Sequence, residues 1–386
     1  MSDYNNAVSG TDAEVGHVTA AKVKNTLLLD AEREEDIERA AQIIRQGGLV
    51  AFPTETVYGL GGNATDPEAA KKIYAAKNRP SDNPLIIHIA TPGDAEKYAY
   101  TNELYYKFAK AFMPGPLTII LPRKNTIPLE TTGGLESVAV RCPSNPIAHE
   151  LIKITGVPIA APSANLSGKP SPTNAVHVRD DMNGRVDIII DGGNCDIGLE
   201  STIIKLENDS DKVTLLRPGG ITYDALCCVS DNVVVSDAVV NKLADNERPL
   251  SPGMKYRHYA PTAPVVLLEG NETDVVSFLK AETENKSKKC LILCYSEETK
   301  LLPSENIIDI GAMNDLDTQA KRLFTALRNA DKLSPDIIYA HLPPKDGIGL
   351  ALYNRMIRAA AHTIKKITKD DIQNAPNNSC SALTYK

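Results

Sequence analysis

Residues 77–88 read KNRPSDNPLIIH, a basic loop followed by an apolar run. Two cations, Lys77 and Arg79, stand at the start of the loop, and Pro84 leads into the apolar residues from Leu85. The pattern predicts a loop that ends in a buried β-strand. Such loops often hold phosphate in α/β enzymes, because the sheet fixes their charged side chains in place. A solvated turn before a core strand would explain these residues as well, so the decision depends on the rest of the chain.

Short apolar runs alternate with helical patterns along most of the 386 residues, which predicts α/β structure in two domains. The first domain is expected at 25–222 and a linker at 223–262. Strands and helices alternate regularly in 263–370, which predicts a smaller parallel, Rossmann-like sheet. The polar ends, 1–24 and 371–386, are expected to be flexible tails.

Composition narrows the class of protein. The net charge of -7 argues against nucleic-acid binding by overall electrostatics. No run approaches the roughly 20 apolar residues of a membrane span, and the polar N-terminus lacks a signal-peptide pattern. The seven cysteines have no spacing typical of a zinc site or a disulfide framework. We therefore expect a reduced, cytoplasmic protein that makes no membrane contact.

Three arginines stand near the ends of predicted strands. Arg79, Arg141 and Arg217 are far apart in the sequence, and each lies at a strand terminus. Arginine suits a two-pronged grip on phosphate or carboxylate, because its planar fork matches two oxygens at once. The pattern favours a site for a polyanion, although three unrelated surface arginines would give the same sequence.

The segment 53–66, PTETVYGLGGNATD, reads as a polar, glycine-rich loop. Thr54 and Thr56 offer hydroxyl groups, and the glycines would let the backbone approach a ligand closely. Glycine-rich loops are also common as simple turns, so this segment is weak evidence by itself.

A second small-residue loop follows a predicted strand in 158–173, PIAAPSANLSGKPSPT. It is not a phosphate-binding P-loop, because Ser163 and Pro170 stand where that motif needs glycine and serine or threonine. Ser163, Asn165 and Ser171 can still hydrogen-bond phosphate or ribose oxygens.

The linker contains the run KYRHY at 255–259, which concentrates charged and aromatic groups in a proline-rich segment. Most such segments are solvated connections. The alternative is a strap that covers a neighbouring site, and this is the hypothesis that we keep.

Seven motifs occur in order along the first domain: PTETVYGLGGNA, KNRPSDNPLIIHI, PGPLTIIL, VAVRCP, APSANLSGKPSPT, GLESTII and LRPGG. Together they resemble the YrdC family of threonylcarbamoyl-AMP synthases. SPGMKYRHYAP, followed by a second α/β domain, resembles the long two-domain form of these enzymes. The resemblance implies a YrdC-like twisted mixed sheet with helices and a concave, positively charged cavity.

The resemblance also implies a nucleotidyltransferase reaction. L-Threonine, bicarbonate and ATP would give L-threonylcarbamoyladenylate and pyrophosphate. A tRNA threonylcarbamoyl transferase would then pass the threonylcarbamoyl group to an adenosine beside the tRNA anticodon, so tRNA would be an indirect partner. Mg²⁺ would come with the ATP phosphates, with no protein side chain as ligand and no organic cofactor.

Site residues carry over by motif position, and the resemblance implies Lys77 and Arg79 as the catalytic cations. The threonine side would consist of Thr54, Thr56, His88, Arg141 and Ser201. The ATP side would consist of Lys77, Arg79, Asn83, Ser137, Ala161, Ser163, Asn165, Ser171, Arg217, His258 and Tyr259.

Three other readings remain. The cavity could belong to an RNA-binding module without catalysis, but the chain lacks interleaved aromatics and a long basic stripe. A carbamoyl-transfer maturation enzyme would be expected to carry zinc-finger cysteine pairs, which this chain does not contain. An α/β scaffold without activity is the third alternative.

Overall fold

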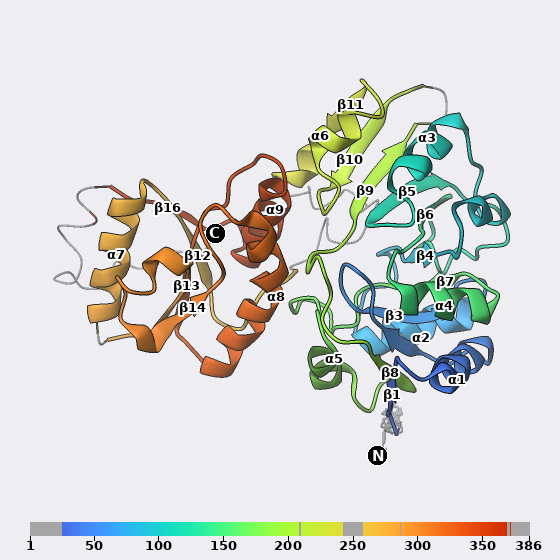
Figure 1. The fold of residues 1–386 in the computed structure, drawn as a ribbon, viewed down its shortest axis with the longest axis horizontal. Helices are drawn as coiled ribbons and strands as arrows, with labels where there is room; N and C mark the ends of the chain where they lie inside the picture. The colour runs from blue at the N-terminus through green and yellow to red at the C-terminus, as the bar shows by residue number, and fades with distance from the viewer. Residues whose placement is uncertain (1–24, 208–209, 242–257, 286, 369–370, 372–386) are drawn as a thin grey trace, which may run out of the picture.

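The computed structural model describes five parts of the chain: residues 25–207, 210–241, 258–285, 287–368 and 371. Two α/β domains lie side by side, the first on the right of Figure 1 and the second on the left. The two predicted tails and residues 242–257 lie outside the described residues, apart from Asp371. The predicted fold class, a mixed α/β domain followed by a smaller parallel one, is confirmed.

The first domain is built on a mixed sheet. In the described residues its strand order is β1-β8-β2-β3-β7-β4-β6-β5-β9-β10-β11. The strands are β1 (Leu27–Asp30), β2 (Val50–Phe52), β3 (Gly59–Asn63), β4 (Ile86–His88), β5 (Leu117–Pro122), β6 (Ser137–Arg141), β7 (Ile159–Ala160), β8 (Ile188–Asp191), β9 (Thr202–Leu206), β10 (Val213–Arg217) and β11 (Val233–Val235). The sheet is mixed, because it contains parallel pairs such as β4 with β6 and antiparallel pairs such as β5 with β6.

Amphipathic helices cover this sheet. They are α1 (Glu34–Arg45), α2 (Pro67–Lys77), α3 (Glu103–Phe112), α4 (Pro146–Thr155), α5 (Ala175–Met182) and α6 (Tyr223–Cys227), with the 3₁₀ helices η1 (Pro92–Lys97) and η2 (Asp237–Val239). Helix α3 shows why they form. Asn102 caps its first turn by accepting from the Tyr105 N–H, and Leu104, Tyr105 and Phe108 form its buried face.

The second domain has a parallel five-stranded sheet in the order β14-β13-β15-β12-β16. Its elements are β12 (Val265–Glu269), α7 (Glu272–Glu284), β13 (Cys290–Cys294), η3 (Ser296–Glu298), η4 (Ser304–Asn306), β14 (Ile307–Asp309), α8 (Leu316–Leu333), β15 (Ile337–His341), α9 (Gly349–Ala359) and β16 (Ile364–Lys366). Every strand pairing is parallel, as the alternating sequence pattern predicts.

Two segments are more regular than the sequence suggests. The glycine-rich segment 53–66 contains β3, and a Cβ at Gly61 would lie 2.7 Å from Phe52 and 2.8 Å from Ile159. Glycine is needed there because neighbouring side chains pack directly on the backbone. The segment 223–262 contains α6 and β11, and β11 extends the first sheet by pairing with β10.

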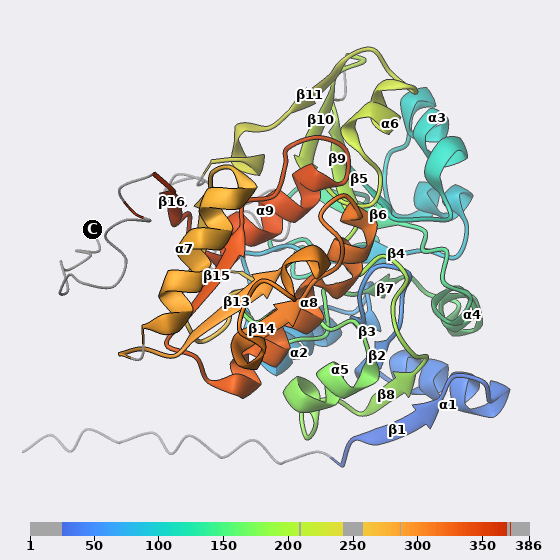
Figure 2. The same cartoon turned by 60° about the vertical axis from the view of Figure 1, so that its left-hand side comes forward.

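The two domains share an apolar core. Helices α8 and α9 face the first domain in both views (Figures 1 and 2). Val57 and Leu199 of the first domain join one buried cluster with Phe324 and Met356 of the second. A cluster that crosses the junction couples the two domains mechanically, because separating them would expose its apolar side chains to water.

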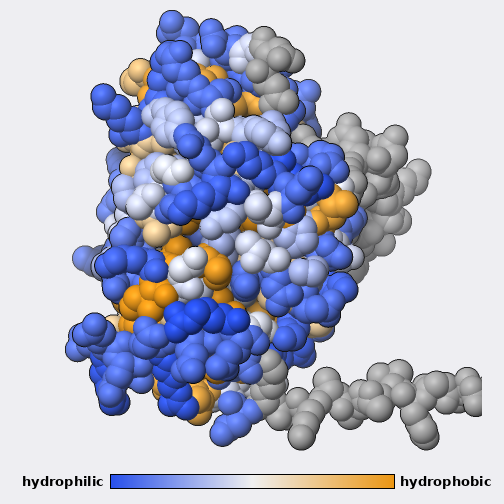
Figure 3. All heavy atoms as spheres, turned by 90° about the vertical axis from the view of Figure 1, so that its right-hand side faces the viewer, coloured by the Kyte–Doolittle hydropathy of each residue, from blue (hydrophilic) through white to orange (hydrophobic). Residues whose placement is uncertain are grey.

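The outer face of the first domain differs from this junction. Figure 3 shows mainly hydrophilic residues there, with hydrophobic ones in small, separate groups. Scattered exposed apolar side chains of this kind are ordinary on protein surfaces. Within the described residues, the structure contains no helix long and apolar enough to cross a membrane.

Gly198 lies against α8 of the second domain, so replacing it tests how rigid the contact between the two domains is. Its φ is +80°, and a Cβ there would lie 2.5 Å from Lys321 Cα on α8. We expect Gly198→Ala to lower the free energy of unfolding by about 3 kcal/mol, through backbone strain plus the clash. Urea unfolding measures the change.

Gly193→Ala is the matched control, because Gly193 has a φ of +75° but open space around a Cβ. Gly193→Ala should lower the free energy of unfolding by about 1 kcal/mol, from backbone strain alone. An equal decrease in the free energy of unfolding of the two variants would show that α8 moves aside readily to make room for the added Cβ.

Candidate active site

A pocket lies between the strand ends of the first domain and residues 258–259. Polar and charged side chains from many elements line it. They are Thr54, Tyr58, Arg79, His88, Arg141, Ser163, Asn165, Lys169, Ser171, Glu200, Ser201, Arg217, His258 and Tyr259, and the lining is completed by Val57, Gly59, Ile86, Ala161 and Pro162. The three arginines predicted to form a polyanion site are therefore brought together.

Arg79 reaches the pocket because of the way α2 ends. Asn78 adopts a left-handed conformation with φ 52° and turns the chain at the helix C-terminus, a position that asparagine tolerates well. The Arg79 guanidinium then donates to the carbonyl oxygens of Asn83 and Pro84, at 3.3 and 3.1 Å. These bonds hold the cation against the loop.

The ends of β4 and β6 form a second corner of the pocket. His88 and Arg141 are register partners on these parallel strands. Arg141 Nη2 lies 2.8 Å from Glu55 Oε1, and both side chains are buried. Burial raises the pKa of Glu55, but the charge of Arg141 and its hydrogen bond lower it more, so the carboxylate stays ionised.

His88 is a neutral group in this corner. Burial, followed by the charge of Arg141, lowers its pKa to about 3. An imidazole with such a pKa is uncharged near neutral pH and keeps one ring N–H. In this state His88 can offer a hydrogen bond but no positive charge.

Arg217 and Ser201 form the third corner, at the entry of β9 and the end of β10. Arg217 donates to the Ser201 carbonyl at 3.0 Å and to its hydroxyl at 3.1 Å. The Ser201 hydroxyl also bonds Thr118 Oγ1 at 2.7 Å. The guanidinium is thereby fixed in one orientation at the pocket wall.

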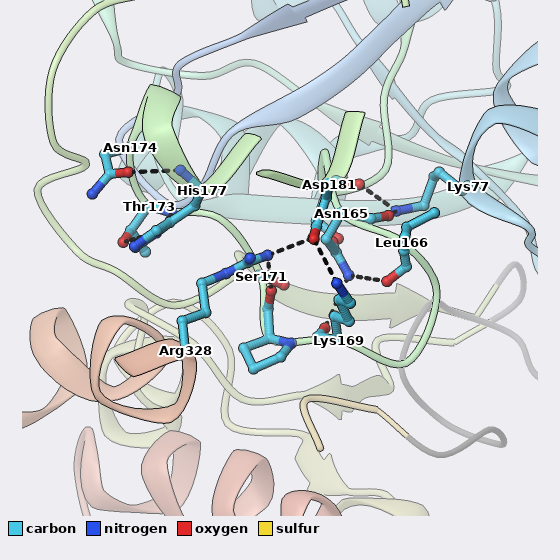
Figure 4. A network of polar contacts seen from close by, with 12 residues as sticks. Lys77, Asn165, Leu166, Lys169, Ser171, Thr173, Asn174, His177, Asp181 and Arg328 are labelled. Atoms are coloured by element: carbon cyan, nitrogen blue, oxygen red, sulfur yellow. Dashed lines mark hydrogen bonds and ion pairs between the residues drawn. The ribbon is translucent and has the colours of Figure 1, made fainter. Parts of the chain in front are cut away.

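Lys77 lies behind the pocket and shapes its loop. Its ammonium group donates to the carbonyl oxygens of Ser163 and Asn165 (Figure 4). Burial, followed by the charge of Arg79, lowers the pKa of Lys77 well below its ordinary value. Asn165 Nδ2 in turn donates to the carbonyls of Leu166 and Lys169, at 2.8 and 2.9 Å. The loop is thus closed on itself.

The second domain contributes to the same loop. Asp181 on α5 binds Lys169 Nζ at 3.0 Å with one oxygen and Arg328 Nη2 at 2.7 Å with the other (Figure 4). Arg328 lies on α8 and also donates to the Pro170 carbonyl at 2.6 Å. Lys169 therefore lines the pocket while its counter-ion is shared with the second domain.

His258 and Tyr259 close the pocket on one side. Tyr259 is buried and its ring stacks on Phe324 of α8, with ring centroids 5.2 Å apart. Burial, followed by the charges of Arg79 and Arg358, lowers the pKa of His258 to about 3. Like His88, it is a neutral group at physiological pH.

Four predicted site residues do not line the pocket. Thr56 lies directly behind Thr54, with their hydroxyl oxygens 2.8 Å apart. Lys77 and Asn83 are buried supports of the two loops described above. Ser137 begins β6 and Arg141 ends it, about 13 Å apart at the usual rise of a strand. The remaining predicted residues all line it.

Three charged groups of the site were missed by the sequence analysis: Glu55, Lys169 and Glu200. Each stands inside a motif that the analysis did quote, PTETVYGLGGNA, APSANLSGKPSPT or GLESTII. A signal was therefore present for all three. Glu55 and Glu200 were missed because a carboxylate repels anions and is not expected in an anion site. Lys169 was missed because only the hydroxyl and amide side chains of its loop were assigned a role.

The arrangement favours binding an anion. Arg79, Arg141, Lys169 and Arg217 face the pocket, and no thiol is present among its described lining residues. Its two histidines are neutral. A site of this kind can position and neutralise charged reactants, which is catalysis by orientation and electrostatics.

The fold and the pocket together define a two-domain α/β protein with a pocket lined by cations, which lies between a mixed-sheet domain and residues 258–259 packed against a parallel-sheet domain. A family model for Sua5, YciO and YrdC proteins, described as "Telomere recombination", matches residues 42–219. A second model, described as "Threonylcarbamoyl-AMP synthase, C-terminal domain", matches residues 221–361. The chain belongs to the threonylcarbamoyl-AMP synthase family.

Individual relatives agree over nearly the whole length. The threonylcarbamoyl-AMP synthase of Bacillus subtilis (strain 168) is 44% identical, with 85% of this chain and 93% of the relative covered. The synthase of Pyrococcus abyssi is also 44% identical, with 87% and 98% covered. A crystal structure of P. abyssi Sua5 complexed with L-threonine superposes with a TM-score of 0.83, at 43% identity, with 89% of this chain and all of that chain covered.

Buried histidines predict a pH-dependent stability. His177 on α5 is buried, and burial with the charges of Arg328 and Lys332 lowers its pKa to about 4. The unfolded chain, with an ordinary histidine pKa near 6.5, binds the proton first as pH falls. Stability from this group is present above pH 6.5 and is lost between pH 6.5 and 4, at up to about 1.4 kcal/mol per pH unit.

Urea unfolding between pH 7.5 and 4.5 measures this loss. His177→Asn should flatten the slope by about one proton, because the amide oxygen can replace Nδ1 as acceptor for the Thr173 N–H but cannot titrate. An unchanged slope in this variant would show that His177 does not cause the loss.

Proposed function

We propose that the chain condenses L-threonine, bicarbonate and ATP into L-threonylcarbamoyladenylate and pyrophosphate, for threonylcarbamoyladenosine modification of tRNA next to the anticodon. The observation that carries the proposal is the convergence of Arg79, Arg141 and Arg217 in one pocket. Such a pocket suits reactants that are both anions. The L-threonine complex of the P. abyssi protein supports threonine as one of them.

The proposed chemistry needs positioning above all. The threonine amine and CO₂ from bicarbonate form a carbamate, with loss of water from bicarbonate. A carbamate oxygen then attacks the α-phosphorus of ATP in line, and the bond to the pyrophosphate leaving group breaks. Both partners are negatively charged and the carbamate is unstable in water. The protein must therefore neutralise charge, align the two groups and exclude solvent.

Threonine fits the corner formed by Thr54, His88, Arg141 and Ser201. We propose that the Arg141 guanidinium binds the threonine carboxylate, while Glu55, whose Oε1 lies 2.8 Å from Nη2, orients this guanidinium. A buried arginine without a counter-ion would be costly, so the pair prepares the site before substrate arrives. Thr54 and Ser201 offer hydroxyl groups for the side chain and the carboxylate of threonine.

ATP fits the opposite side of the pocket. We propose that Arg79 binds the triphosphate and Arg217 the phosphate of the adenylate, with Lys77 as the cation that orders the adjoining loop. Ser163, Asn165, Ser171 and the Ala161 backbone would bind the nucleotide, and His258 and Tyr259 would close over it. Asn83 supports Arg79 through its carbonyl. For Ser137 the proposed nucleotide contact stays a prediction.

Mg²⁺ would be carried by the ATP phosphates. The two carboxylates at the pocket are each paired with an arginine, Glu55 with Arg141 and Glu200 with Arg355. Engaged carboxylates fit a metal that is held mainly by substrate phosphates and water. When bound, Mg²⁺ would offset the negative charge of the phosphates.

The product would be passed to a tRNA threonylcarbamoyl transferase, so tRNA takes part indirectly. We propose a cytoplasmic location. The six cysteines in the described part of the chain are free thiols, which suits a reducing compartment.

Arg79→Ala tests the proposed reaction. The variant should fold, because Arg79 lies in a loop, but its kcat/KM for pyrophosphate release should fall by about 100- to 1,000-fold, equivalent to ~2.7–4 kcal/mol. The assay uses radiolabelled bicarbonate with ATP, with and without L-threonine. Arg39→Ala on the exposed face of α1 is the control. Near-normal turnover in Arg79→Ala, or turnover that needs no threonine in the parent chain, would overturn the assignment.

A further inference from the structure

Arg355 of α9 is fully buried at the domain junction, with an exposed fraction of 0%. Its Nε donates to Glu200 Oε2 at 2.9 Å and its Nη1 to the Pro218 carbonyl at 2.9 Å. Its Nη2 also donates to the Glu200 carbonyl at 3.3 Å. Residues 200 and 218 are the direct neighbours of Ser201 and Arg217. One guanidinium from the second domain thus fixes two segments of the pocket wall.

Glu200 carries this contact into the pocket. Its carboxylate lines the cavity and accepts a hydrogen bond from the Ser171 hydroxyl. Burial raises its pKa, but the charges of Arg355 and Arg217 outweigh burial and hold the pKa below its ordinary value. Without Arg355, an ionised carboxylate would face the phosphates of a bound nucleotide with less of its charge balanced.

Tyr259 is the third group that depends on Arg355. The guanidinium carbon lies 5.7 Å from the centre of the Tyr259 ring, on which Phe324 also stacks. Tyr259 has a φ of +62°, a backbone conformation that tyrosine adopts only when its surroundings enforce it. Two helices of the second domain supply those surroundings, and the ring is held at the pocket as a result.

We propose that Arg355 is a positioning residue for the nucleotide half of the site, acting through Glu200, Ser171 and Tyr259. The second domain thereby completes a pocket whose other walls belong to the first. This inference rests on the proposed function, since it takes ATP as the ligand of that half. Among the described residues, Arg355 donates to Glu200, Pro218 and Asn354, and its one bond beside the threonine corner is the long one to the Glu200 carbonyl next to Ser201. The larger effect should therefore fall on ATP.

Steady-state kinetics of the full chain test the proposal. Arg355→Met should raise the KM for ATP about tenfold or more, while the KM for L-threonine changes less than about twofold. In the Glu200→Gln background the same replacement should raise the KM for ATP less than about threefold, because no carboxylate charge is left to balance. A purely structural role would instead lower the melting temperature and change both KM values together.

Thr325→Val is the matched control. It removes another contact between the domains, the 3.2 Å hydrogen bond between the Thr325 and Thr173 hydroxyls, without touching Glu200 or Tyr259. Its kinetic constants should equal those of the parent chain. If Arg355→Met does not fold, the same KM values are measured for Arg355→Lys. The lysine keeps the charge but loses the fork, so the KM for ATP should rise about three- to tenfold with that for threonine unchanged.

Three results would overturn the proposal: an unchanged KM for ATP in the folded Arg355 variants, equal changes in both KM values, or no suppression by Glu200→Gln. Failure of the proposed function is a separate result, seen as no adenylate formation by the parent chain. In that case ATP binding by the parent chain and by Arg355→Met is compared by calorimetric titration. Weakened ATP binding by Arg355→Met would still support the inference, and unchanged binding would overturn it.

Discussion

Burial of arginine charge is the constraint on which this structure depends. A pocket for two anionic reactants needs fixed cations away from bulk water, yet an unpaired buried guanidinium is strongly unfavourable. Each buried arginine of the site meets this with a fixed partner: Arg141 with Glu55, Arg217 with Ser201, and Arg355 with Glu200. The partners bind the arginines before substrate does. The site is therefore organised in advance, and its cations do not have to be reoriented during the reaction.

The same constraint explains which side chains of the site carry charge and which are neutral. Burial beside cations lowers the pKa of His88 and of His258 to about 3, so both imidazoles are neutral near neutral pH and add no positive charge to the pocket. The positive charge of the pocket therefore comes from its arginines and Lys169, which suits the proposed displacement between two anions. The second domain contributes to the balance of charge from outside the sheet, through Arg328 and Arg355 on two adjacent helices.

The sequence alone revealed more of the residues that line the pocket than of the residues that hold them in place. Arg141 and Arg217 could be linked because each ends a strand, and Arg79 because it stands in the basic loop that leads to one. The mixed sheet followed from the resemblance of the ordered motifs. The pairing of Arg355 with Glu200 could not be found that way, because 155 positions separate the two and only domain packing brings them together. Strand β3 was missed for another reason: glycine gives no alternation of apolar side chains, although close packing by Phe52 requires it there.

Lys77 shows how a buried cation can stabilise a loop instead of binding a ligand directly. Its side chain has an exposed fraction of 1%, and its ammonium group donates to the carbonyl oxygens of Ser163 and Asn165. Burial, followed by the charge of Arg79, lowers its pKa, so keeping the ammonium charged at this position costs free energy. The two carbonyl dipoles offset part of that cost. The shape of the loop and the charge of the lysine therefore depend on each other.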